Sequence, residues 1–113
     1  MLSDPVQSFW NSLFAQVQDR VSKRNEESGP HLKFERIPNG FRVCRESPFL
    51  AVERWLDDSL IYGCAKEYGK SDSLFQQLTI TGENAALLPE DPLRKSKPLT
   101  TDVVAGWVLD SFQ

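Results

Sequence analysis

The sequence predicts an α+β fold: an N-terminal amphipathic helix, an antiparallel meander sheet of five or six strands and a C-terminal helix, with both helices packed on one sheet face. Apolar residues recur at the three-and-four spacing of a helix face near each end of the chain. Between these stretches, short β-branched and aromatic segments alternate with turn residues. The length of 113 residues and the hydrophobic fraction of 40% fit a single domain, 1–113, with one core.

The first helix is predicted to begin at Asp4 and Pro5 and to end at Ser28-Gly29-Pro30. Asp4 suits the N-cap, and Pro5 suits the first helical position. Gly29 suits the left-handed conformation that closes a last helical turn. The apolar stripe that the sheet must cover consists of Val6, Phe9, Trp10, Leu13, Phe14, Val17 and Val21.

Three sequential hairpins are predicted between the helices. They pair residues 32–37 with 41–46, 52–56 with 60–65, and 74–81 with 85–88. In the first turn, Pro38-Asn39-Gly40, the glycine is expected to adopt a positive φ as a bulge, which places Ile37 opposite Phe41. Apolar and polar residues alternate without interruption over 74–81, so this segment is predicted to be one continuous strand.

Residues 48–58 also fit a short helix, with Ser47 as its cap and Pro48 in its first position. We favour a strand because aromatic and β-branched residues such as Val52 and Trp55 prefer strands. The element order and acidic balance are similar to small secretion chaperones. Those proteins place a helix in mid-chain, which is absent here unless residues 48–58 are helical, so we assign no family.

After a polar connector between Pro89 and Pro98, a closing helix is predicted to begin near Thr100 or Thr101 and to run to the chain end. Its apolar face is predicted to consist of Val103, Val104, Trp107, Val108 and Phe112.

The composition argues against two classes of partner. A net charge of -3 lacks the surplus of Lys and Arg that nucleic-acid binding requires, and no apolar run reaches the length of a membrane span. The start of the chain has no signal-peptide pattern, so a soluble protein of the cytoplasm is predicted. Cys44 and Cys64 belong to no CxxC pair, and we expect them to be reduced and buried in the sheet.

The sequence nominates no catalytic, cofactor-binding or metal-binding residue, and we predict no enzyme activity. His31 is the only histidine, and no nucleophile turn accompanies it. One histidine and two separated cysteines lack the spacing of a metal site. No glycine-rich phosphate loop is present in the sequence.

These features favour a non-enzymatic protein-interaction module, an adaptor or chaperone-like domain with a protein partner or a second copy of itself. The candidate contacts are Phe9, Trp10 and Phe14 of the first helix and Arg94, Lys95 and Lys97 of the connector. The simpler interpretation makes Trp10, Trp55 and Trp107 core anchors. The alternative function is binding of a small apolar ligand in a cavity between sheet and helices, lined by aromatic residues such as Phe34, Phe41, Trp55 and Tyr62.

Overall fold

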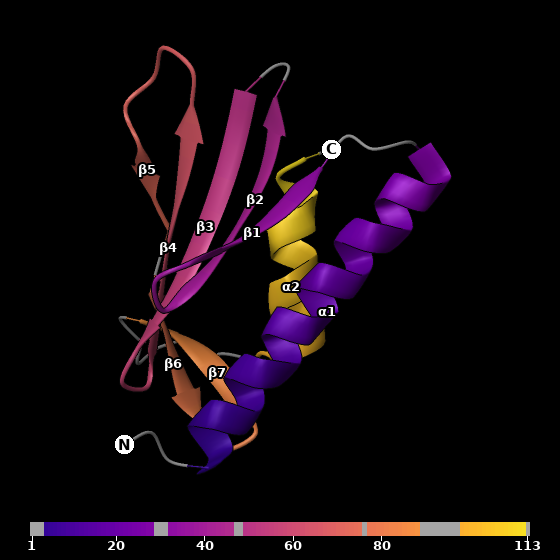
Figure 1. Ribbon diagram of the computed structural model, residues 1–113. Coiled ribbons are helices and arrows are strands. Elements are labelled where there is room, and N and C mark those ends of the chain that lie inside the picture. The colour runs from indigo at the N-terminus through magenta and orange to yellow at the C-terminus, as the bar shows by residue number, and fades with distance from the viewer. Residues whose placement is uncertain (1–3, 29–31, 47–48, 76, 89–97, 113) are drawn as a thin grey trace.

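Both helices lie side by side on one face of a single antiparallel sheet (Figure 1). They are α1 (Asp4–Ser28) and α2 (Thr101–Asp110). The predicted α+β class and the packing of both helices on one sheet face are therefore confirmed. This computed structural model describes residues 4–28, 32–46, 49–75, 77–88 and 98–112.

The sheet has seven strands within the described residues. They are β1 (Lys33–Ile37), β2 (Gly40–Glu46), β3 (Phe49–Asp57), β4 (Leu60–Glu67), β5 (Ser73–Leu74), β6 (Gln77–Thr81) and β7 (Asn84–Leu88). Their order across the sheet is β1-β2-β3-β4-β6-β7, and β5 also pairs with β4. The number exceeds the predicted five or six because the segment expected to form one strand over 74–81 is divided between β5 and β6.

The core lies between the helices and the sheet. Leu13 and Val17 of α1 are fully buried, as are Phe41, Val43 and Val52 on the facing side of the sheet. The helical spacing of the first apolar stripe therefore predicted the buried face of α1. Its buried members are Val6, Phe9, Trp10, Leu13, Val17 and Val21.

The first hairpin has a register one residue away from the predicted one. Ile37 pairs with Gly40 and not with Phe41. Asn39 takes the left-handed turn conformation, with φ of 62°, that was expected of the glycine. Gly40 instead opens β2, where a Cβ would lie 2.0 Å from the carbonyl oxygen of Arg54. The glycine is thus required by the close approach of β3.

The segment predicted as either strand or helix is a strand, β3. It pairs with β2 along one side and with β4 along the other, so it lies at the centre of the sheet. Val52 and Leu56, on the side that faces the helices, are buried. The described part of residues 48–58 is therefore not the mid-chain helix of the small secretion chaperones, and the resemblance to them loses its support.

Strands β5 and β6 are offset by one residue against β4. Leu74 of β5 pairs with Cys64, and Leu78 of β6 pairs with Ile61. The chain therefore advances four residues from Leu74 to Leu78, while β4 advances only three between their partners. An extra residue of this kind forms a β-bulge and shifts the alternation of faces. Phe75, whose N–H donates to the Gly63 carbonyl at 2.9 Å, consequently shares the helix-facing side with Leu78. Uninterrupted alternation had placed these two residues on opposite faces.

Helix α2 begins where predicted, with Thr100 as its N-cap accepting a hydrogen bond from the Val103 amide at 3.3 Å. It ends at Asp110, short of the chain end. Its buried face also differs from the prediction, because Val103 and Trp107 are exposed. The buried residues of this segment are Val104, Ala105, Val108, Leu109 and Phe112.

Polar contacts fix α2 against α1. The Gln16 amide donates to the Thr101 hydroxyl at 2.6 Å, and Arg24 donates to the carbonyl of Leu109 at 3.1 Å. Arg20 of α1 forms an ion pair with Asp102. These contacts hold both ends of α2, and with it Trp107, at a defined place above the sheet.

Candidate functional site

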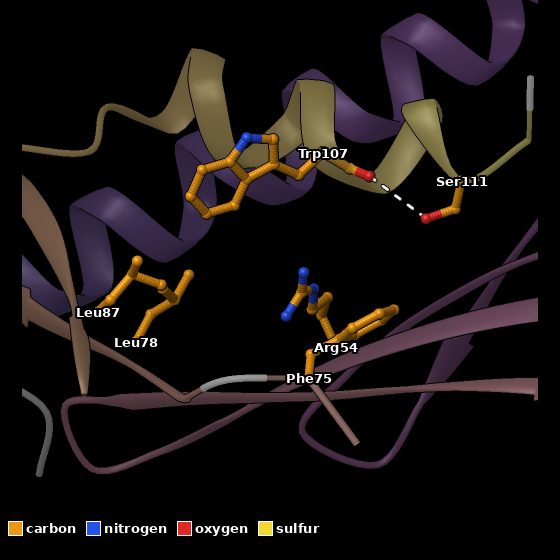
Figure 2. A pocket seen from close by; sticks show the side chains of 6 residues that line it. All are labelled: Arg54, Phe75, Leu78, Leu87, Trp107 and Ser111. Atoms are coloured by element: carbon orange, nitrogen blue, oxygen red, sulfur yellow. Dashed lines mark hydrogen bonds between the residues drawn. The ribbon is translucent and has the colours of Figure 1, made fainter. Parts of the chain in front are cut away.

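A cavity of about 320 Å³ lies between α2 and the sheet (Figure 2). We call it the Arg54 cavity. Its lining comes from β3, β6, β7, α2 and the residues that flank β5 and α2, which lie far apart in the sequence. The six residues that line it are Arg54, Phe75, Leu78, Leu87, Trp107 and Ser111.

Arg54 is a charged residue in a core-facing row. It lies between Val52 and Leu56 in the alternation of β3, and it pairs with Phe41 of β2. Residues that pair directly across strands point to the same face, so Arg54 points toward the helices, as the fully buried Phe41 does. Only 5% of Arg54 is exposed.

Gly63 makes room for the Arg54 side chain on the neighbouring strand β4. The two residues pair across β3 and β4. A Cβ at position 63 would lie 2.5 Å from Nη1 of Arg54 and 2.7 Å from its Cδ. The arginine therefore lies over a stretch of strand that any larger residue would block.

Phe75 reaches the same place through the offset between β5 and β6. The guanidinium carbon of Arg54 lies 4.5 Å from the centre of the Phe75 ring, which is a cation–π contact. Figure 2 shows the two side chains next to each other on the sheet side of the cavity. The bulge thus gives the arginine an aromatic neighbour while leaving its charge uncompensated.

Arg54 has no counter-ion within the described part of the chain. Its Nε atom is buried and makes no hydrogen bond there, and no carboxylate forms an ion pair with it. Burial lowers the pKa of the guanidinium to about 10, so the group remains a cation at neutral pH. Arg42, on the opposite sheet face, has Glu35 and Glu53 at 3.3 and 3.4 Å.

Trp107 and Ser111 approach the cavity from α2. Figure 2 shows the indole of Trp107 above the gap that separates Leu78 and Leu87 from Arg54. The Ser111 hydroxyl donates to the Trp107 carbonyl at 3.4 Å. Trp107 is 37% exposed, so it covers the cavity at the surface. The interpretation of Trp107 as a core anchor is therefore wrong.

Of the contact residues predicted from the sequence, the three on α1 do not line the Arg54 cavity. Phe9 and Trp10 are buried in the core. Phe14 is partly buried and packs edge-to-face against Phe34, with the two ring centres 5.1 Å apart. Burial leaves Phe9 and Trp10 little surface for a partner. The predicted connector residues Arg94, Lys95 and Lys97 lie outside the described residues.

The aromatic residues expected to line a cavity are not among the described residues that line the Arg54 cavity. Phe34 and Phe41 stack on each other in the core with ring centres 5.7 Å apart. Trp55 and Tyr62 stack at 5.9 Å on the sheet face that points away from the helices. The Arg54 cavity lies between α2 and the sheet and is lined by other residues.

Sequence reasoning missed Arg54 and Phe75. A signal for Arg54 was present, because β3 carries Leu50, Val52 and Leu56 at alternate positions and an arginine in the same row. A charged residue in such a row requires either a partner or a function. No comparable signal for Phe75 is present in the sequence, because the offset depends on how β5 and β6 pair with β4.

The described residues were not found to form a metal site or a membrane-spanning helix. They contain no cluster of His, Cys, Asp or Glu side chains that would hold a metal ion, and His31 lies outside them. None of the described helices has the length and apolar character needed to cross a membrane.

Comparisons of the chain with protein-family models, with curated proteins and with solved structures each returned no match. Function must therefore be inferred from the side chains around the Arg54 cavity.

Proposed function

We propose that this domain is a non-catalytic module that binds a small, largely apolar molecule in the Arg54 cavity. The cavity itself, about 320 Å³ between α2 and the sheet, carries the proposal. None of its six described lining residues is a histidine, a carboxylate or a thiol. We therefore propose binding without catalysis.

The lining has the character of a ligand site. Small-molecule sites are typically concave, about 300–1,000 Å³ in volume and mostly apolar, with a few polar groups that orient the ligand. Leu78, Leu87 and Trp107 supply apolar surface, and Arg54 and Ser111 supply the polar groups. The volume lies near the lower end of that range, which favours a small ligand.

Calorimetric titration tests this proposal with four probes: octanoate, octanamide, 3-phenylpropanoate and 3-phenylpropanamide. We expect the protein to bind at least one of them. Leu87→Trp should abolish that binding, because the added indole fills the cavity that Leu87 lines.

Leu74→Trp is the matched control, because it adds the same side chain at a position that is 82% exposed and does not line the cavity. It should bind as the unsubstituted protein does. Failure of all four probes to bind, or equal binding by the two tryptophan variants, would contradict ligand binding in this cavity.

A protein-interaction module is the second candidate, favoured by the open face of the sheet. No described helix covers that face (Figure 1). It carries the stacked Trp55 and Tyr62 and, at β5, the exposed Leu74. Native mass spectrometry of the freshly purified protein discriminates the two, because a dimer or a bound protein would favour this candidate and a small adduct would favour the first.

For either function we propose a cytoplasmic setting. Cys44 and Cys64 are free and buried in the sheet, an arrangement that suits a reducing compartment.

A further inference from the structure

The guanidinium group of Arg54 restricts the chemistry of the molecule that the cavity takes. Building on the binding function proposed above, we propose that the ligand is a small monocarboxylic acid with an apolar body, and that Arg54 binds its carboxylate.

The need for an anion follows from the state of Arg54 in the described structure. Its side chain is a cation, its exposed fraction is 5%, and its Nε–H has no acceptor among the described residues. A buried charge without a partner is costly, because the loss of hydration is not replaced. A bound carboxylate supplies both the opposite charge and the missing acceptors.

The geometry around the guanidinium group favours a carboxylate. The guanidinium carbon lies over the Phe75 ring, 4.5 Å from its centre, so the ring covers one side of the planar group. The N–H donors lie in the plane and point outward from its edge, where a carboxylate accepts two parallel hydrogen bonds. Figure 2 shows the guanidinium nitrogens directed toward the space below Trp107, which is where the ligand would lie.

The charge balance favours one negative charge. Arg54 is the only charged residue among the six described residues that line the cavity. A carboxylate balances it, whereas a phosphate monoester carries about -1.5 to -2 at neutral pH and leaves an unbalanced charge in the cavity.

The rest of the lining sets the ligand's body. Leu78 and Leu87 lie across the cavity from Arg54 in Figure 2, with the Trp107 indole above the gap between them. A ligand whose carboxylate meets Arg54 therefore extends an aliphatic chain or an aromatic ring toward the two leucines. This is the amphipathic shape of a short fatty acid or an aryl-substituted acid.

The test compares each acid with its neutral amide. We expect octanoate and 3-phenylpropanoate to bind at least about tenfold more tightly than octanamide and 3-phenylpropanamide, because a hydrogen bond between two ions is stronger than one to a neutral acceptor. Arg54→Met and Arg54→Gln should each bring acid and amide to within about twofold of each other. Two variants are used so that a folding defect in one leaves the test intact.

Arg36→Met is the matched control. Arg36 also lies over an aromatic ring, that of Phe14 at 4.9 Å, but it is exposed and does not line the cavity. This variant should keep the full preference for the acids. Phenyl phosphate should bind more weakly than 3-phenylpropanoate to the unsubstituted protein.

The outcomes separate this inference from the function on which it rests. Equal binding of acids and amides by the unsubstituted protein would overturn the carboxylate inference and leave ligand binding standing. Binding of no probe would overturn both. A preference for acids that persists in both Arg54 variants, or tighter binding of phenyl phosphate, would overturn the assignment of a single carboxylate to Arg54.

Discussion

Arg54 occupies a position in β3 where its neighbours in the same row, Val52 and Leu56, are buried apolar residues. The fold tolerates the charge because Gly63 leaves space for the side chain and Phe75 lies against it. Neither neighbour neutralises the guanidinium group. A buried charge in such a row is the observation that supports the proposed ligand, because real proteins depart from local rules at functional sites.

Arg54→Met should therefore stabilise the unliganded protein. Methionine keeps an unbranched side chain in the same space and removes the buried charge, so we expect the free energy of unfolding to rise by about 1–3 kcal/mol. Urea denaturation at neutral pH measures this change. A loss of stability would contradict the account, because it would mean that Arg54 is paired in the folded state.

The pH dependence of this gain has a definite sign. The folded pKa of Arg54, about 10, lies well below the ordinary pKa of a guanidinium group, so the folded state disfavours the cation. The cost of burying the Arg54 cation is therefore complete below about pH 10 and is relieved as the pH rises above that value. The stability difference between Arg54→Met and the unsubstituted protein should be constant from about pH 6 to 9 and become smaller above pH 10.

Arg42→Met is the comparison for this prediction. Arg42 pairs with Glu35 and with the buried Glu53, so its removal should lower the free energy of unfolding by up to about 1 kcal/mol. Changes of opposite sign in the free energy of unfolding of Arg54→Met and Arg42→Met would show that the missing counter-ion matters. A general effect of removing positive charge would give both variants the same sign.

At the scale of elements, the cavity depends on strand β4 and on the break between β5 and β6. Gly63 on β4 gives Arg54 its place, and the one-residue offset brings Phe75 to the same face as Leu78. Bulges redirect side chains in this way and are frequent next to functional sites. Helix α2 contributes Trp107, and its contacts with α1 fix the position of that side chain.

Gly63→Ala should disturb the site more than the fold. The new methyl group would meet the end and the Cδ of a flexible side chain, so Arg54 moves while the strands keep their pairing. We expect a change in unfolding free energy of less than about 1 kcal/mol, together with loss of the preference for acids over amides. Denaturation and calorimetric titration measure the two effects.

Gly40→Ala provides the contrast. Its methyl group would meet the backbone oxygen of Arg54 at 2.0 Å, which a rotamer change cannot relieve, so it should destabilise the protein by about 3 kcal/mol. If Gly63→Ala destabilised the protein as strongly, or left the acid preference unchanged, the proposed role of Gly63 would be wrong.

At the scale of the whole molecule, both helices share one sheet face, and this is the part of the fold that local patterns predicted. The spacing of apolar residues in α1 and the turn residues between strands depend only on neighbours in the sequence. The hairpin register at Ile37 and Gly40 was not predictable in that way, because Gly40 is required by contact with β3.

The candidate site was less predictable than the fold for the same reason. Arg54, Phe75 and Trp107 come from three separate segments and meet only when α2 packs over the sheet. Trp107 was assigned to the core because its helix is amphipathic, yet it lies at the edge of the buried face and covers the cavity. Such a site follows from long-range packing, which periodicity along the chain does not describe.

Recognition of a carboxylate by Arg54 can be tested on the guanidinium group itself. A nitrogen-15 spectrum of the arginine Nε–H groups contains a resonance that Arg54→Met removes, which assigns it to Arg54. We predict that 3-phenylpropanoate shifts this resonance strongly, with the saturation behaviour of the calorimetric titration, and that 3-phenylpropanamide leaves it nearly unchanged. An Arg54 resonance that stays in place while the acid binds would contradict the claim that this buried cation recognises the ligand.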